Sequence, residues 1–244
     1  MMLPRVFVGT MFAGEGDLQA CIDSVRLQKN VDVKHHIISN LPEKEAHNKL
    51  WQAWRDAKHE QDMFVKLDAD TMLAGSVILE SFWTLMSSNP RITGIQAPLA
   101  DFFTDGAING LNCFHPRVTF NDTSSDLFCD RGIDVDHDIV IKSKDVPPEL
   151  RPAGYHCYNA TDEQAFHFGL HRMLKRQSDV LDRVKKAYRL KPERKRGLAL
   201  IGASMAASFN AGGFNYSDER FRVAFDAATS RYDDLVRSAL VRLT

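Results

Sequence analysis

The first seventy residues alternate short apolar runs with longer stretches of helical periodicity. The apolar runs are residues 5–9, 32–39 and 63–67, and each contains Val or Ile. Between them, residues 17–28 and 43–58 place apolar side chains at helical spacing. This strand and helix order predicts a parallel sheet with right-handed crossovers. In such sheets the ligand site lies beyond the carboxyl ends of the strands.

The remaining chain divides into a middle region and a helical end. We predict a helix over residues 77–86, a strand over 91–97, and a loop-rich stretch over 101–138 that suits acceptor recognition. From residue 162 the pattern is helical, with a break near Pro192. The predicted helices there cover residues 162–187, 197–209 and 218–243, and the last is amphipathic.

Composition excludes several classes of protein. The 31 basic and 32 acidic residues give a net charge of -1, so no global field recruits nucleic acid or an anionic membrane. Four cysteines without Cys-x-x-Cys spacing indicate reduced thiols, which predicts a cytoplasmic location. The start of the chain lacks the pattern of a secretory signal. The longest weakly polar stretch, residues 197–209, is shorter than the roughly twenty residues of a bilayer helix, so we expect no transmembrane segment.

The strongest motif for chemistry is Asp68-Ala69-Asp70, which follows Lys66 and Leu67 at the end of the third predicted strand. Two carboxylates separated by one residue can bind one hard cation, while a diphosphate supplies further oxygen ligands. The cation then stabilises the negative charge that builds on a departing diphosphate. A solvated turn is the alternative interpretation, and the position after a buried strand favours the metal motif.

The order of residues over the first hundred positions resembles family 2-like GT-A glycosyltransferases. The resemblance rests on Glu15, Leu18, Cys21-Ile22, Ser24-Val25 and Gln28, then Val33, Ile37-Ile38-Ser39-Asn40, Asn48, Ala53-Trp54 and Leu67-Asp68-Ala69-Asp70. It implies an α/β, GT-A-type (Rossmann-like), mostly parallel sheet flanked by helices, with a helical C-terminal extension. It further implies a catalytic domain over residues 1–180 and the extension over 181–244.

The resemblance also implies a donor site and a metal site. Gly9, Thr10, Asn40, Lys66 and Asp68 are expected to bind the nucleotide sugar. Many relatives have Asp where Asn40 stands, so the base is open, although a UDP-sugar is favoured. Asp68 and Asp70 are expected to hold Mn²⁺ or Mg²⁺, and His156 to complete the metal shell, since imidazole also suits manganese.

Two further histidines, His167 and His171, are four residues apart on a predicted helix and offer an alternative metal pair. A polar helix face is the plainer interpretation of both. His156 likewise has the alternative of a structural, hydrogen-bonded histidine.

The catalytic base has two candidate positions. Glu163 and Asp162 begin a predicted helix, whose dipole favours an ionised carboxylate. Asp136 lies in the acidic run of residues 134–138. An inverting transferase needs one carboxylate within reach of the acceptor hydroxyl, and spacing does not choose between them. Family position favours Glu163 or Asp162, while helix capping explains the same residues without catalysis.

Basic and aromatic clusters are secondary candidates. The basic run of residues 185–196 suits donor phosphates, an anionic acceptor, a membrane surface or a solvated linker. Trp51 and Trp54 are interpreted as core or as a subunit contact, which leaves homo-oligomerisation open. The candidates for stacking on a sugar ring are Phe102, Phe103 and Phe114.

Missing motifs narrow the alternatives. The chain has no Gly-x-Gly-x-x-Gly after its first strand and no Gly-Lys-Ser/Thr triplet, which excludes a dinucleotide fingerprint and a P-loop. The loop of residues 10–15 is acidic, unlike the basic loop of a sugar-nucleotide pyrophosphorylase. The prediction is a metal-dependent, inverting glycosyltransferase with a nucleotide-sugar donor and an unidentified hydroxyl acceptor. The alternatives are a metal-dependent nucleotidyltransferase or phosphotransferase and a non-catalytic carbohydrate-binding relative.

Overall fold

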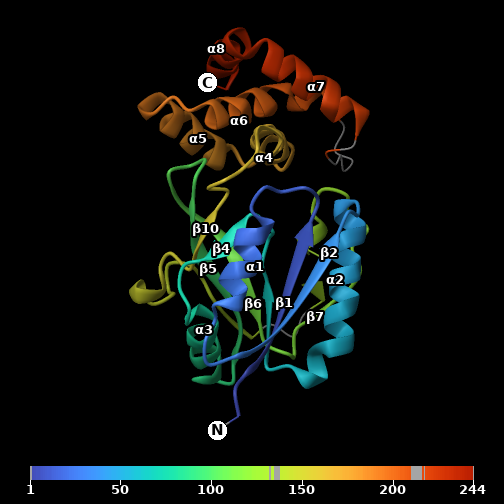
Figure 1. Ribbon diagram of the computed structural model, residues 1–244, viewed down its shortest axis with the longest axis vertical. Coiled ribbons are helices and arrows are strands. Elements are labelled where there is room, and N and C mark those ends of the chain that lie inside the picture. The colour runs from blue at the N-terminus through green and yellow to red at the C-terminus, as the bar shows by residue number, and fades with distance from the viewer. Residues whose placement is uncertain (1, 132, 135–137, 210–215, 217, 244) are drawn as a thin grey trace.

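The computed structural model describes residues 2–243 except 132, 135–137, 210–215 and 217. A twisted sheet with helices on both faces forms the lower part of the molecule in Figure 1, and a layer of helices lies across its upper end. The N-terminus lies at the far end of the sheet from this helical layer. The upper end is where the parallel strands finish, which is the end that the sequence predicts for the ligand site.

Eight strands of the described chain form one sheet in the order β2-β1-β3-β6-β5-β10-β4, with β9 beside β5. Neighbouring strands run parallel except where β6 meets β3 and β5, and where β4 meets β10. The predicted α/β class with a mostly parallel sheet is therefore confirmed. The strands are β1 (Arg5–Phe12), β2 (Asp32–Ser39), β3 (Met63–Lys66), β4 (Thr71–Leu73), β5 (Ile92–Asp101), β6 (Gly106–Phe114), β9 (Ile139–Ile141) and β10 (Gly154–His156).

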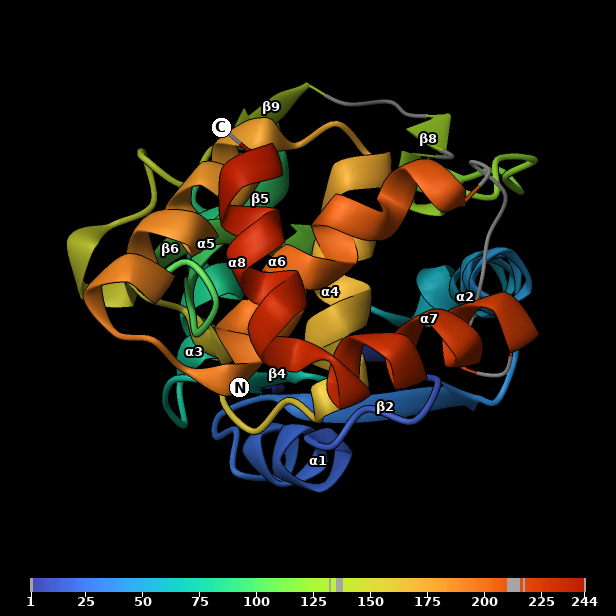
Figure 2. The same ribbon diagram turned by 90° about the horizontal axis from the view of Figure 1, so that it is seen from above.

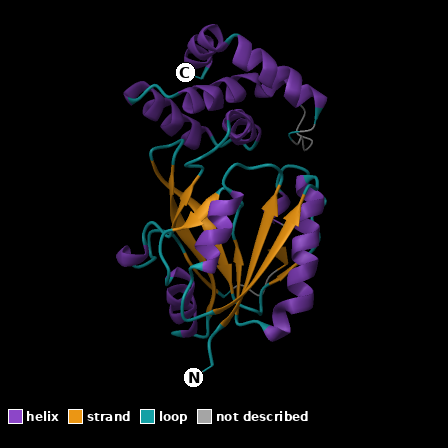
Figure 3. Ribbon diagram, in the orientation of Figure 1, coloured by secondary structure: helices purple, strands orange, loops and turns teal. Residues whose placement is uncertain are grey.

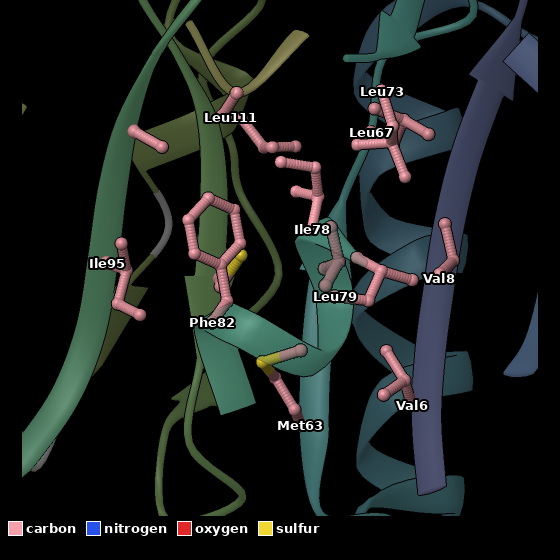
Figure 4. Packing of buried hydrophobic residues seen from close by; sticks show 14 of the residues in the cluster. Val6, Val8, Met63, Leu67, Leu73, Ile78, Leu79, Phe82, Ile95 and Leu111 are labelled. Atoms are coloured by element: carbon pink, nitrogen blue, oxygen red, sulfur yellow. The ribbon is translucent and has the colours of Figure 1, made fainter. Parts of the chain in front are cut away.

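Helices cover both faces of this sheet, as Figure 3 shows. They are α1 (Leu18–Arg26), α2 (Glu43–Ala57) and α3 (Ile78–Ser87). Alternate residues of β1 separate the two cores: Val6 and Val8 pack with α1 and α3, and Phe7 packs with α2. Figure 4 shows Val6, Val8 and Phe82 in the first of these cores. The alternation of side chains along β1 thus decides which helix each of them meets.

The second core, between the sheet and α2, is aromatic. Trp51 and Trp54 are 1% and 0% exposed, and their rings lie against Phe64 and Phe120. The indole nitrogen of Trp54 donates to the carbonyl of Val118 at 2.9 Å. The interpretation of both tryptophans as core residues is confirmed.

The middle region differs from its prediction. Residues 101–138 were expected to be loop-rich, yet β6 runs through the centre of the sheet between β3 and β5. The strand predicted to end at Ala97 also continues to Asp101, because the register shift between Ala97 and Pro98 accommodates the proline. The sequence signal was weak because β6 is rich in Gly and Asn, which single-sequence patterns assign to turns.

The short elements connect these strands. A two-stranded sheet pairs β7 (Thr119–Phe120) with β8 (Ile133–Asp134). The 3-10 turns are η1 (Lys58–Glu60), η2 (Cys129–Arg131), η3 (Pro148–Leu150) and η4 (Ala206–Ser208).

The helical layer contains α4 (Asp162–Leu174), α5 (Ser178–Leu190), α6 (Arg194–Met205), α7 (Glu219–Ser230) and α8 (Tyr232–Arg242). These helices share one hydrophobic cluster with Phe103. Figure 2, seen from above, shows α6 crossing over α4, with α8 lying over α6. Two predicted helices are each divided: residues 162–187 break at Arg176, which has φ 56°, and residues 218–243 break at Arg231. The predicted domain boundary at residue 181 lies inside α5, and the two-domain division stays a prediction.

Glycine explains how closely α4 and α6 approach. A Cβ added at Gly169 would lie 1.6 Å from the carbonyl oxygen of Ala199, and one at Gly202 would lie 2.1 Å from the carbonyl oxygen of Phe166. Backbone therefore meets backbone at this crossing, which no larger residue allows.

None of the helices in the described ranges has both the length and the apolar character needed to span a bilayer.

Candidate metal centre

A cleft of about 800 Å³ lies between the upper end of the sheet and the helical layer. Its walls come from the loop after β1, the start of α2, the ends of β3 and β10, the middle of β6, and α4. Five described carboxylates line it: Glu15, Glu43, Asp68, Asp70 and Asp130. The lining cations are Lys66, Lys142, Arg172 and Lys175. A cleft that mixes both charges in this way is suited to a cation bound together with an anionic ligand.

Hydrogen bonds join the sheet side of the cleft to its helical side. The side-chain oxygen of Gln164, in the first turn of α4, accepts from the backbone N–H of Gly16 at 2.9 Å. Asp17 accepts from the backbone N–H of Asn159 at 3.1 Å. Thr161 and Gln164 form a capping box at the start of α4. The loop after β1 is thereby fixed to the helical layer, which Figure 1 shows directly above it.

Three adjacent strands bring the metal candidates together. His156 at the end of β10 is in register with Asp101 of β5 and with Thr71 of β4, the residue after Asp70. His156 Nδ1 lies 2.6 Å from Asp101 Oδ1, and His156 Nε2 lies 3.6 Å from Asp70 Oδ2. A ring nitrogen that donates to a carboxylate leaves the other nitrogen as a metal ligand, so the residues present fit a divalent cation.

Burial and the neighbouring carboxylates act in opposite directions on the pKa of His156. Burial lowers the pKa, but Asp70 and Asp101 outweigh burial and raise it. For Asp101, burial raises the pKa, and the bonds from His156 and Thr104 outweigh that effect and lower it. Asp101 is therefore an ionised, fully buried partner that orients the histidine.

Cys157 completes this cluster. Its sulfur lies 3.2 Å from Asp70 Oδ2 and 3.4 Å from His156 Nε2, and Asp70, His156 and Cys157 can present ligand atoms within 4.8 Å of one another. Burial, reinforced by the Asp70 charge, raises the pKa of Cys157 well above its ordinary value. Cys157 therefore stands beside Asp70 as a neutral thiol that donates to the carboxylate.

Asp68 is placed differently from Asp70. Its Oδ1 atom lies 2.6 Å from Lys66 Nζ, and its side chain is 46% exposed. Partial desolvation by the cleft walls raises the pKa of Asp68, but Lys66 outweighs this effect and lowers it. Both predicted carboxylates and His156 line the cleft, with Asp68 paired to a lysine and Asp70 in the histidine and cysteine cluster.

The other predicted donor residues lie outside the cleft lining. Gly9 is buried in β1, where an added Cβ would lie 2.3 Å from Leu50 Cδ1. Thr10 is fully buried and its hydroxyl bonds His35 Nε2 at 2.9 Å. Asn40 is exposed, with φ 59°. Packing against α2 and β2 accounts for Gly9 and Thr10, and a role of these two residues in donor binding stays a prediction. The neighbouring residues that do line the cleft are Met11 and Phe12 at the end of β1, and Ala13 and Glu15 in the loop after it.

The predicted bases are also displaced from the cleft. Asp162 pairs with Arg194 at 2.9 Å, and Glu163 is exposed; neither lines the cleft, although Gln164 beside them does. Asp136 lies outside the described residues. Asp138, from the same acidic run, pairs with Arg91 at 2.9 Å away from the lining. Successive side chains at the start of a helix point in different directions, so sequence position alone did not show which of them faces the cleft.

Glu15 and Asp130 are cleft carboxylates that the sequence did not single out as bases. Burial raises the pKa of Glu15 to about 7, and Asp70 and Asp68 add to this effect. Asp130 Oδ1 lies 3.9 Å from Lys175 Nζ. Glu15 was part of the family resemblance but had no assigned role, and nothing in the local pattern around Asp130 marked it.

The aromatic and basic candidates have mostly structural roles. Phe103 is fully buried and stacks on Phe168, and Phe102 lies under the Arg196 guanidinium; Phe114 does line the cleft. Arg196 is buried and donates to the carbonyl of Phe102, and Lys185 donates to the carbonyl of Leu243. The basic run contributes no residue to the described cleft lining, so contact of this run with donor phosphates in this cleft is not supported.

Comparison with known proteins gives likenesses in structure. No protein-family model matches the chain, and no curated protein matches it. A mannosyltransferase from Pyrobaculum calidifontis in complex with GDP-Man and Mn²⁺ is 14% identical with a TM-score of 0.41, over 100% of this chain and 86% of that one. A glycosyltransferase involved in glycosylation of the major capsid of PBCV-1 is 13% identical with a TM-score of 0.29, over 46% and 60%. Residues 1–349 of S. aureus TarS are 9% identical with a TM-score of 0.39, over 98% and 90%.

Proposed function

We propose that this chain transfers a sugar from a nucleoside-diphosphate sugar to a hydroxyl acceptor, with a divalent cation bound in the cleft. The observation that carries the proposal is the meeting of Asp70 with the oriented imidazole of His156 beside Asp68, at the carboxyl ends of the strands. This is the end of an α/β sheet at which ligands bind. The order of residues over the first hundred positions supports the same class.

Asp70, His156 and Asp68 are the residues that would hold Mn²⁺ or Mg²⁺, and the bound cation would neutralise charge on the leaving diphosphate. Lys66, Arg172 and Lys142 line the same cleft and are the candidates for donor oxygens. Lys66 is paired with Asp68, which holds the lysine in position. A bound diphosphate would compete with Asp68 for the Lys66 ammonium group.

The base is proposed from the cleft rather than from the start of α4. Glu15 combines a place in the lining with a pKa near neutrality, which suits proton transfer at physiological pH. Asp130 is the second candidate. An inverting reaction needs one such carboxylate beside the acceptor hydroxyl, and we propose inversion. If Glu15 is the base, Glu15→Gln lowers kcat for transfer about 100-fold or more and leaves donor binding in place.

A panel of UDP-, GDP- and other nucleotide sugars tests the donor, measured by thermal shift with and without Mn²⁺. At a hundred times Kd a ligand adds about 2.7 kcal/mol, which corresponds to roughly 5 to 10 °C for a chain of this size. We expect one base to give such a shift only with metal, and UDP is favoured.

We also propose, from the buried free thiols, that the protein acts in the cytoplasm.

Turnover tests the class of reaction. We expect slow, Mn²⁺-dependent hydrolysis of the donor that falls at least about 100-fold in Asp70→Asn. Asp56→Asn, on the exposed side of α2, is the matched control and should keep the wild-type rate. Pyrophosphate release from a nucleoside triphosphate would favour a nucleotidyltransferase. Binding of a nucleotide sugar without turnover under any metal would favour a non-catalytic protein.

A further inference from the structure

A second cluster of metal-ligating side chains lies on the wall of the cleft formed by α2. Glu43 and His47 are one turn apart on that helix, and Cys129 approaches them from η2. The three residues can present ligand atoms within 4.8 Å of one another. None of them belongs to the Asp70, His156 and Cys157 cluster.

His47 is arranged as metal-binding histidines are. Its Nδ1 atom lies 2.9 Å from the backbone carbonyl of Glu43, which places the ring proton on Nδ1 and the lone pair on Nε2. The residue is 3% exposed, and Nε2 is buried without a hydrogen-bond partner among the described residues. A buried imidazole nitrogen with its lone pair unused is the position that a ligand would fill.

A fourth donor lies next to Glu43. His171 Nε2, from α4, is 3.8 Å from Glu43 Oε2 and is likewise buried without a hydrogen-bond partner in the described chain. Each of the two imidazole rings therefore offers a buried nitrogen to a metal.

The two lysine ammonium groups that line the cleft near this cluster each have a carboxylate partner. Lys175 lines the cleft at the end of α4, but Asp130 Oδ1 is 3.9 Å from its ammonium group, and Lys66 is paired with Asp68. The Cys129 thiol donates to the backbone carbonyl of Ser125, and burial raises its pKa to about 12. Binding a metal would release that proton, as it does for other thiol ligands.

We propose that Glu43, His47 and Cys129, with His171 as the fourth ligand, form a zinc-type site distinct from the Asp70 cluster. Sulfur and imidazole donors select zinc or cobalt over the oxygen-preferring Mg²⁺ and Ca²⁺. A metal there would join the start of α2 to η2 and to the helical layer, and so brace one wall of the cleft. The proposal does not depend on glycosyl transfer.

Cobalt is the probe, because a cysteine ligand gives a thiolate-to-cobalt absorption band in the near ultraviolet and tetrahedral cobalt absorbs strongly in the visible. The metal-free protein is titrated with Co²⁺, and Zn²⁺ is then added to displace it. We expect one equivalent of Co²⁺ to produce both features, and Zn²⁺ to abolish them. Absence of a thiolate band in the wild-type protein would overturn the proposal.

Cysteine variants locate the band, because each of the two clusters contains one cysteine. Cys129→Ser should abolish it and Cys157→Ser should keep it; the reverse result would assign the band to the Asp70 cluster and refute the second site. Cys113→Ser, in the sheet core, controls for loss of a buried thiol.

His47→Gln keeps the thiol and should weaken Co²⁺ binding at least about tenfold. Unchanged affinity in His47→Gln would also refute the site, whatever the stability of Cys129→Ser.

Discussion

His156 Nδ1 lies 2.6 Å from Asp101 Oδ1, and both side chains are buried, at 7% and 1% exposure. The second carboxylate oxygen of Asp101 accepts from the backbone N–H of Thr104 at 2.7 Å. Asp101 is thus held in place on one side and holds His156 on the other. The remaining imidazole nitrogen faces Asp70 as a direct result.

Asp101→Asn should therefore weaken binding of Mn²⁺ without removing a ligand. Loss of such an orienting partner lowers metal affinity about 10- to 100-fold. The dissociation constant for Mn²⁺ is measured by the metal dependence of donor hydrolysis and by calorimetry. At saturating metal, KM for the donor should stay near its wild-type value. Equal metal affinity in both proteins would show that Asp101 has no positioning role.

Arg196→Met tests whether the basic run has a structural role. The guanidinium donates to the carbonyl of Phe102 at 3.1 and 2.8 Å and lies 4.9 Å from the Phe102 ring centroid. Leaving a carbonyl buried without its donor costs about 1–3 kcal/mol, so the unfolding temperature should fall. Lys195→Met, next in the chain, should change it much less. A raised KM for the donor in Arg196→Met, with unchanged stability, would contradict this interpretation.

Gly169→Ala should destabilise the helical layer strongly. The new methyl group would overlap the backbone of α6, which cannot move aside as a side chain can, and we expect a loss of about 3 kcal/mol or more. Gly75→Ala is the matched control, since a Cβ there meets nothing within 4 Å. Chemical denaturation measures both. Equal free energies of unfolding for the two variants would show that α4 and α6 do not cross as closely as described.

The pH dependence of stability contains a contribution from His35. Its pKa is lowered, chiefly by burial and further by Arg26 and His36. The unfolded chain therefore takes up a proton at a higher pH than the folded protein does. This contribution is fully present above the ordinary histidine pKa of about 6.5 and is lost as the pH falls through the folded pKa.

His35→Gln should accordingly reduce the loss of stability between pH 8 and pH 5. The hydroxyl of Thr10 keeps a polar partner in this variant, which limits the damage at pH 8. Unfolding temperatures are compared at both pH values for the two proteins. A larger acid-induced loss in the variant than in the wild type would reverse the predicted sign.

The sequence by itself determined the class of the sheet and those helices and strands whose signals are local. Hydrophobic periodicity placed β2 at its observed bounds and β1, β3 and α1 to α3 near theirs, because each such pattern depends on which face of one element is buried. It also placed Asp68 and Asp70 at the end of β3, facing the cleft. It missed β6, whose Gly and Asn residues carry no strand signal, and the continuation of β5 past Pro98.

Tertiary structure decided which side chains meet. His156 lies 55 residues from Asp101, and Cys157 lies 87 residues from Asp70, yet pairing of β10 with β5 and β4 puts these residues side by side. The cluster of Glu43, His47 and Cys129 likewise joins α2 to a distant turn. Strand order and helix docking depend on burial summed over the whole chain, so no local pattern contains them. The sequence therefore placed the acidic pair after a buried strand, and only the packed fold decided its partners.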